Sequence, residues 1–284
     1  MRIAITGSEG MLGRTLQKTL SSHELFPLSK QRCDITNPKV VHSVLSDLRP
    51  DVVIHCAAMT KVDKCEVEQH KAWLVNTFGT SNIASASNRI GARLVTISTD
   101  YVFDGNLDRP YHEFDVPEGK SCFYGMTKRV AEDVVRTHCP NHVILRTAWL
   151  YGERGPSFVH TMLKLAEPED LPIKVVNDQL GNPTSTLVLS NIVKSLLDYP
   201  EIVGTIHASC EGEASWYDFA KEIFCILKLK KRVQPCSSSE YPTLAKRPKN
   251  SRLEKMILHE LGIIEIPDWR DALRTFLLDH KSCV

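Results

Sequence analysis

The sequence lacks an excess of charge of either sign, because 35 lysines and arginines stand against 34 aspartates and glutamates. A near-neutral chain has no basic field to hold a nucleic-acid backbone, so we expect no nucleic-acid partner. It also lacks any apolar run near the roughly 20 residues that a membrane helix needs, so we expect no membrane partner. Its first residues, Met1–Gly7, do not show the pattern of a signal peptide, which favours a cytoplasmic location.

Paired cysteines are missing as well. The nine cysteines, at positions 33, 56, 65, 122, 139, 210, 225, 236 and 283, include no CxxC pair, and the 11 histidines show no ligand-like spacing. We therefore assign no metal site. An odd number of scattered cysteines without a secretion signal is typical of reduced thiols in a cytosol. All nine are expected to react with a thiol reagent after unfolding, without reductant.

Short apolar runs alternate with helix-like stretches through the first half of the chain. Residues 2–6, 51–58, 93–98 and 142–146 are apolar runs, and apolar residues recur at helical spacing in 13–20 and 40–48. Such runs are typical of parallel strands that are buried on both faces. The pattern predicts an α/β fold with a doubly wound parallel sheet of the Rossmann type.

The pattern changes after Trp149, which predicts a second unit. A helix near 187–197 and a strand near 204–208 indicate a return to the sheet, whereas the chain from about 211 is mostly helical. We predict a dinucleotide-binding domain of residues 1–150 plus about 186–208. Residues from about 151–185 plus 209–284 are expected to form a smaller, mostly helical substrate-binding lobe at the carboxyl edge of the sheet, where α/β folds bind ligands.

A glycine turn follows the first predicted strand and opens a helix. Gly7, Gly10 and Gly13 permit a tight turn, close approach of the backbone to a pyrophosphate, and close packing of helix on strand. The spacing is GxxGxxG rather than GxGxxG, and a plain strand–helix turn is the alternative. The position of the turn in the chain favours a dinucleotide site.

Two cations follow the second predicted strand, 25–28, where NAD enzymes carry a carboxylate. Lys30 and Arg32 stand there, and no acidic residue precedes Asp34. The 2′-phosphate of NADPH would favour these cations, so we expect NADPH to be used several-fold better than NADH, with NADH still accepted. The alternative is a solvated basic turn without a role in cofactor choice.

Tyr124 and Lys128 lie four residues apart, on one face of a predicted helix. An ammonium beside a phenol favours the phenolate and lowers the phenol pKa from about 10, which suits Tyr124 to general acid catalysis. Thr99 stands at the end of a predicted strand, where its hydroxyl can hydrogen-bond a substrate carbonyl. A surface contact would explain a lone Tyr–Lys pair, but the pair, the hydroxyl and the glycine turn together are far more specific.

Over almost its whole length the sequence resembles the dTDP-4-dehydrorhamnose reductase family of extended short-chain dehydrogenases and reductases. The similarity is carried by Pro50–Glu66, Ser98–Gly105, Arg146–Gly152, Asp178–Thr184, Ser215–Tyr217, Tyr241–Thr243, Arg247–Ser251 and Pro267–Leu273. It implies reduction of the C4 keto group of a dTDP-4-dehydro-6-deoxy sugar, with dTDP-4-dehydrorhamnose and dTDP-L-rhamnose as the favoured substrate and product. The family includes dimers with a shared metal, so a homodimer is a candidate assembly, but the sequence identifies no carboxylates for a metal.

The resemblance also implies which residues form the site. Gly10, Met11 and Leu12 would line the pyrophosphate, Asp34 and Ile35 would contact the adenosine, and Ala57, Ala58, Met59 and Thr60 would lie along the ribose and nicotinamide. Thr99, Asp100 and Trp149 would meet the sugar nucleotide, and Tyr124 and Lys128 would form the catalytic pair beside the cofactor. Trp149 could instead be a core aromatic, and we expect Trp216 and Trp269 to pack rather than to contact ligand. Asp178 and Gln179 could simply hold a loop at the lobe interface.

Two other function classes stay open. A non-catalytic, dinucleotide-binding regulatory subunit like the β subunit of methionine adenosyltransferase would keep the fold, but it would need neither the Tyr124–Lys128 pair nor the 178–184 segment. Another sugar-nucleotide epimerase or reductase would keep the pair. A dehydratase is disfavoured, because Thr99 and Asp100 do not supply the Asp–Glu pair that it needs.

Overall fold

A parallel sheet of six strands forms the centre of the molecule in a computed structural model, which describes residues 1–167 and 171–279. The strands follow the order β10-β5-β4-β3-β1-β2, and every neighbouring pair is parallel. Their bounds are β1 Arg2–Thr6, β2 Glu24–Leu28, β3 Val52–His55, β4 Arg93–Thr99, β5 His142–Thr147 and β10 Gly204–His207. The strand order reverses between β1 and β3, so a ligand crevice is expected at their carboxyl ends.

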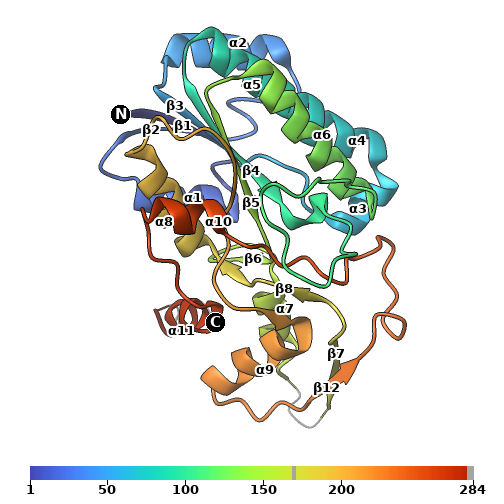
Figure 1. The fold of residues 1–284 in the computed structure, drawn as a ribbon. Helices are drawn as coiled ribbons and strands as arrows, with labels where there is room; N and C mark the ends of the chain where they lie inside the picture. Colours follow the sequence, from blue (N-terminus) through green and yellow to red (C-terminus); the bar gives the residue numbers. More distant parts are fainter. Residues whose placement is uncertain (168–170, 280–284) are drawn as a thin grey trace.

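Helices cover both faces of this sheet (Figure 1). On one face α1 (Met11–Thr19) packs against α8 (Thr186–Leu197), and on the other α2 (Pro38–Leu48) and α6 (Phe123–His138) flank α5 (Gly79–Arg89). Successive residues of β1 pack into different hydrophobic cores. Ile3 and Ile5 belong to the core beneath α1 and α8, and Ala4 belongs to the core beneath α2 and α5. The predicted doubly wound α/β fold is confirmed.

Shorter elements connect the strands near their carboxyl ends. After β3 the chain forms α3 (Val62–Val67), α4 (Gln69–Trp73) and a π-helical segment, η1 (Leu74–Phe78), which runs into α5. A 3-10 turn, η2 (Asp100–Val102), follows β4. π-helical turns inside helices occur often at functional sites, and η1 does supply a contact to the site described below.

The remainder of the chain combines helices with three two-stranded sheets. The helices are α7 (Phe158–Lys164), α9 (Trp216–Ile226), α10 (Met256–Leu261) and α11 (Trp269–Asp279), and the sheets pair β6 (Leu150–Tyr151) with β9 (Thr184–Ser185), β7 (Ile173–Val176) with β12 (Val233–Cys236), and β8 (Leu180–Gly181) with β11 (Ala214–Ser215). These short strands join segments that are distant in sequence, which hydrophobic periodicity does not reveal. The structure places α8 and β10 with the central sheet, and the residue boundaries of the two domains stay a prediction.

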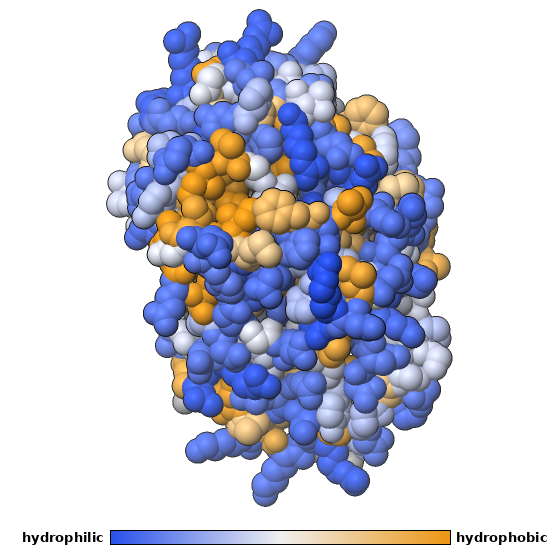
Figure 2. Space-filling view, in the orientation of Figure 1, coloured by the Kyte–Doolittle hydropathy of each residue, from blue (hydrophilic) through white to orange (hydrophobic). Residues whose placement is uncertain are grey.

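The helix α10 packs against β10, the strand at one edge of the sheet. Figure 2 shows that this face is mostly hydrophilic and that apolar side chains gather over α10, whose Met256 and Leu261 are partly exposed.

Three further observations concern the described residues. No helix among them is long and apolar enough to cross a membrane. They contain no group of three or more His, Cys, Asp or Glu side chains that could hold a metal ion. Eight cysteines are free thiols in residues 1–167 and 171–279, and Cys283 lies outside these residues.

Candidate active site

The glycine turn lies where β1 and β3 end side by side. Gly7 adopts φ +64, and a Cβ there would stand 2.8 Å from the backbone nitrogen of Ala57. A Cβ at Gly13 would stand 2.4 Å from the carbonyl oxygen of Gly7. Side chains at these two positions would therefore clash with backbone, which is the close approach that a dinucleotide turn requires.

The first turn of α1 provides backbone donors for an anion. Gly10 is the N-cap of α1, and because it has no side chain it leaves the first backbone N–H groups of the helix uncapped. Gly10, Met11 and Leu12 all line one cavity. The free N–H groups and the positive end of the helix dipole favour a phosphate here. The residues present therefore fit the pyrophosphate of a dinucleotide.

A cavity of about 360 Å³ lies beside the end of β2 and is lined by Lys30, Asp34 and Ile35. The Asp34 carboxylate accepts hydrogen bonds from the hydroxyl and the backbone N–H of Thr36, and both bonds lower its pKa. Arg32 lies outside this cavity, because its guanidinium turns back toward the carbonyl oxygen of Pro27 at 3.4 Å. Only one of the two cations expected to select NADPH therefore reaches the predicted adenosine site.

A second cavity, of about 390 Å³, continues from the glycine turn to the predicted catalytic pair. Tyr124 and Lys128 project from the first two turns of α6, and both side chains are buried. The Lys128 ammonium donates to the carbonyl oxygen of Ile97 at 2.8 Å, which fixes it beside β4. Tyr124, Lys128 and Thr99 line one cavity, as the sequence predicted.

The charge balance at the pair differs from the expectation. Burial raises the pKa of Tyr124 above its ordinary value, and the Thr99 hydroxyl opposes this rise. Burial also lowers the pKa of Lys128 to about 8, against the influence of Glu132. Burial is the largest influence on the pKa of Tyr124, because a phenolate is poorly solvated in a closed site, and the expected lowering of this pKa by Lys128 is not seen within the protein.

Thr99 is engaged with its neighbour. Its hydroxyl donates to the Asp100 carboxylate at 2.9 Å and accepts from the backbone N–H of Tyr101 at 3.2 Å. Burial raises the pKa of Asp100 to about 6, although the hydrogen bonds it accepts act in the opposite direction. A hydroxyl has one proton to donate, so Thr99 can donate to a substrate carbonyl only when it releases Asp100.

A buried asparagine holds the loop after β3. The amide oxygen of Asn76, in η1, accepts from the Met59 backbone N–H at 2.7 Å, and its amide nitrogen donates to the Met59 carbonyl oxygen at 3.1 Å and to the Thr127 hydroxyl at 3.1 Å. Asn76 thus ties the predicted nicotinamide loop to the helix that carries Tyr124. Sequence reasoning missed this residue, because nothing in its local pattern distinguishes it.

Trp149 meets Trp216 at the far wall of the same cavity. Their rings stack with centroids 3.5 Å apart and planes inclined by 3°, and Trp149 holds a backbone φ of +45. The indole N–H of Trp216 donates to the amide oxygen of Gln179 at 3.2 Å. Trp216 therefore lines the cavity, although the sequence suggested packing alone, whereas Trp269 is fully buried in the core.

The two cavities adjoin at Gly7 and Gly10 and together form one groove across the sheet edge. Of the residues predicted from the sequence for cofactor, catalysis or substrate, all but Arg32 line this groove: Gly7, Gly10, Met11, Leu12, Gly13, Lys30, Asp34, Ile35, Ala57, Ala58, Met59, Thr60, Thr99, Asp100, Tyr124, Lys128 and Trp149. Their individual roles stay predictions. The arrangement can bind a dinucleotide in an extended form and present a buried phenol to a ligand beside it.

Comparison with known proteins agrees with this geometry. Residues 1–282 match the family model described as the RmlD substrate binding domain. The chain is 42% identical to a dTDP-4-dehydrorhamnose reductase from Clostridium acetobutylicum, with a TM-score of 0.95 over 99% of this chain and 100% of that one. It is 39% identical to the enzyme of that name from Bacillus anthracis in complex with NADP, with a TM-score of 0.94 over 98% and 99% of the two chains. A probable dTDP-4,6-dihydroxy-2-methyloxan-3-one 4-ketoreductase from Streptomyces antibioticus is 40% identical over 96% of this chain and 94% of that protein.

Proposed function

The chain belongs to the dTDP-4-dehydrorhamnose reductase family, and we propose that it reduces the C4 keto group of dTDP-4-dehydrorhamnose with NADPH to give dTDP-L-rhamnose. The observation that carries the proposal is the single groove in which the glycine turn leads to Tyr124, Lys128 and Thr99. The solved relative in complex with NADP supports the choice of cofactor.

Each residue of the pair has a separate task in this reaction. NADPH, when bound, supplies the hydride. The Tyr124 phenol gives its proton to the C4 oxygen as negative charge develops there. Lys128, held by the Ile97 carbonyl oxygen, contributes positive charge and an anchor for the nicotinamide ribose.

The neighbouring polar groups orient the sugar. The Thr99 hydroxyl moves from Asp100 to the C4 oxygen and stabilises its charge. Trp149, seated against Trp216, bounds the pocket for the sugar and limits access of water. The small-molecule partner in this proposal is therefore a nucleotide sugar. The same proposal includes a homodimeric assembly and a cytoplasmic location.

The test is turnover of dTDP-4-dehydrorhamnose, followed by the absorbance of NADPH. Tyr124→Phe keeps the ring and removes the proton donor, so kcat should fall about 10²- to 10⁴-fold while affinity for NADPH changes little. A variant that keeps more than half of the activity would exclude Tyr124 as the acid. Binding of NADPH without turnover by the unmutated protein would favour the regulatory-subunit alternative.

A further inference from the structure

The turn after β4 packs closely against the start of α6. The ring of Tyr101, in η2, meets the ring of Tyr124 edge to face, with centroids 5.7 Å apart and planes inclined by 71°. A Cβ at Gly125 would stand 2.2 Å from the backbone carbonyl oxygen of Tyr101, so only glycine allows this approach. Tyr101 therefore bounds Tyr124 on one side, and a group that holds the Tyr101 ring also influences the position of the Tyr124 phenol.

The guanidinium of Arg247, from the predicted substrate lobe, acts on the phenol of Tyr101. Burial raises the pKa of this phenol, and the positive charge of Arg247 opposes the rise. The Nη1 atom of Arg247 is buried and makes no well-formed hydrogen bond within residues 1–167 and 171–279. Buried donors are seldom left unpaired, so this nitrogen is available to the Tyr101 phenol oxygen.

Asp63 of α3 fixes Arg247 in turn. Its carboxylate accepts from Arg247 Nη2 at 2.7 Å and from the backbone N–H of Ala245 at 2.9 Å. Three residues along the same helix, the Glu66 carboxylate accepts from the backbone N–H of Phe123, the first residue of α6, at 2.7 Å. The helix α3 therefore ties the predicted substrate lobe to the start of the helix that carries the predicted catalytic pair.

We propose that Arg247 is a positioning residue for the reduction. Anchored on Asp63, it holds the Tyr101 ring in place, and this ring sets the angle at which the predicted acid meets the substrate. The inference rests on the proposed function. A general acid must lie within hydrogen-bond reach of the oxygen that it protonates, and a displacement of about 1 Å can cost about 10²-fold in rate. Arg247 lines neither cavity of the groove, so it acts through Tyr101 and not on the ligand.

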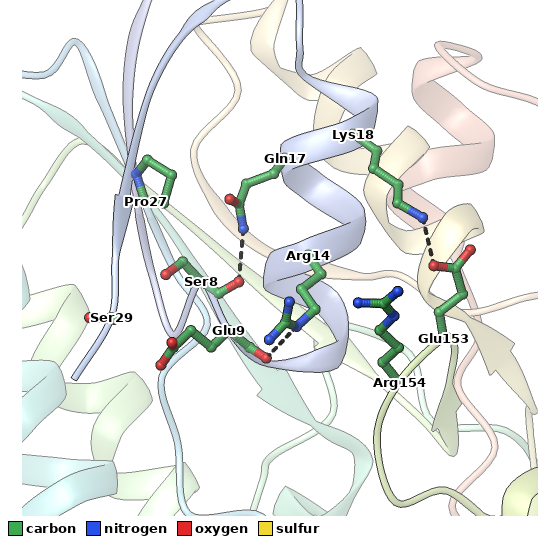
Figure 3. Close-up of a pocket in the computed structure, with 9 residues that line it drawn as sticks. All are labelled: Ser8, Glu9, Arg14, Gln17, Lys18, Pro27, Ser29, Glu153 and Arg154. Carbon is green, nitrogen blue, oxygen red and sulfur yellow. Dashed lines mark hydrogen bonds and ion pairs between the residues drawn. The ribbon is translucent and has the colours of Figure 1, made fainter. Parts of the chain in front are cut away.

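The ion pair of Arg247 with Asp63 should add little to the stability of the fold. The Asp63 side chain is 46% exposed and that of Arg247 is 20% exposed, and solvent screens such pairs. A matched comparison is the ion pair of Lys18 and Glu153, which also joins the two predicted lobes. Its charges lie 2.6 Å apart in a separate cleft along α1 that Tyr124 does not line (Figure 3). Loss of either pair should loosen the lobes similarly, but only loss of the first should disturb Tyr124.

The test compares Arg247→Gln with Lys18→Gln in turnover of dTDP-4-dehydrorhamnose. Arg247→Gln should lower kcat roughly tenfold and leave the KM for NADPH unchanged, because the cofactor groove keeps its residues. The solvent deuterium isotope effect on kcat should rise in this variant, since transfer of the proton becomes slower relative to the other steps. Arg247→Lys should recover part of kcat because it keeps the charge beside Asp63, whereas Lys18→Gln should change none of these constants.

A double-mutant cycle tests the route through Tyr101. If Arg247 acts through the phenol oxygen, Arg247→Gln should cause little further loss of kcat in Tyr101→Phe, which already lacks that oxygen. Losses that multiply in the double variant would show that the two residues act independently and would overturn the proposal.

A second readout needs no turnover. With ring-labelled tyrosine, the NMR signal of Tyr124 is the one that disappears in Tyr124→Phe. Arg247→Gln should shift or broaden this signal, and Lys18→Gln should leave it in place. An unchanged Tyr124 signal in Arg247→Gln, or an equal loss of kcat in Lys18→Gln, would contradict the proposal. If the signal changes as expected but the unmutated protein does not reduce dTDP-4-dehydrorhamnose, the proposed function fails and the control of Tyr124 by Arg247 stands.

Discussion

At the scale of single residues, burial sets the protonation of the candidate active site. The pKa of Lys128 is lowered to about 8 by burial, and that of Asp100 is raised to about 6 by the same cause. Each change disfavours the charged form of its residue. Both groups therefore titrate near neutral pH, whereas their unperturbed counterparts would not.

Lys128 should determine the alkaline limb of activity. Below a pH of about 8 its amine carries a proton, and above this pH it loses the charge that we propose as the anchor of the ribose. We expect kcat/KM to fall as the pH rises through about 8 and the fall to disappear in Lys128→Arg, whose charge persists above pH 12. Rates from about pH 6 to about pH 10 test this, with the exposed Lys120→Arg as control. The same fall in Lys128→Arg would assign the limb to another group.

Asp100 should make the fold less stable as the pH rises. Its pKa of about 6 in the folded chain exceeds the value of about 3.9 for an unperturbed aspartate, so the folded state binds its proton more tightly. The stabilisation from this proton is complete below about pH 4 and is lost as the pH rises through about 6. As the pH rises from about 4 to about 6, the free energy of unfolding of Asp100→Asn should therefore increase by about 1–3 kcal/mol relative to that of the unmutated chain. Urea unfolding at both pH values measures the gain, and a difference independent of pH would contradict it.

At the scale of elements, a buried ion pair fixes the helix that carries the predicted catalytic pair. Glu132 of α6 accepts two hydrogen bonds from Arg146 of β5, at 2.9 and 2.7 Å, and one from Ser98 of β4, at 2.6 Å. Burial would raise the pKa of Glu132, but these partners outweigh it and the pKa is lowered. The network therefore holds α6 in register with both strands, one turn beyond Lys128.

Glu132→Gln should destabilise the fold by about 3 kcal/mol, because the buried Arg146 guanidinium would lose its counter-charge. Asp133→Asn is a suitable control, since Asp133 pairs with Arg129 and Arg136 on the exposed side of the same helix. It should change the free energy of unfolding by less than about 1 kcal/mol. Denaturant unfolding of both variants at neutral pH measures the difference. Equal effects would show that the network adds little to the stability of α6.

At the scale of the whole molecule, the two predicted domains meet at the stacked tryptophans. Trp149 follows the last residues of β5, and Trp216 begins α9. Gln179 fixes Trp216 and donates to the Ser238 hydroxyl at 2.8 Å, and Ser238 in turn donates to Asp178. The expectation that Asp178 and Gln179 hold a loop is thus met by a chain of hydrogen bonds that ends at the cavity wall.

Trp216→Ala should raise KM for the sugar nucleotide roughly tenfold, because Trp149 would lose the surface that orients it. The KM for NADPH should change little, since Trp216 lines only the catalytic part of the groove. Tyr217→Ala, one residue along α9 and outside the cavity, is the matched control. Steady-state kinetics with each substrate varied in turn measure both constants. A parallel rise in the KM for NADPH would indicate general loosening of the lobes.

The sequence by itself determined the fold and the main chemical groups, because both depend on local patterns. Apolar runs of strand length predict a sheet buried on both faces, the glycine spacing marks the turn, and Tyr124 and Lys128 share a helix face whatever the rest of the chain does. Only the tertiary structure decided which of several candidate side chains reach the groove. Arg32 turns away, whereas contacts between segments far apart in sequence bring Trp216 to the cavity wall and place Asn76 against the loop that lines the groove. The protonation of Tyr124 and Lys128 was also decided at this level, since burial is a property of the packed molecule and not of any local pattern.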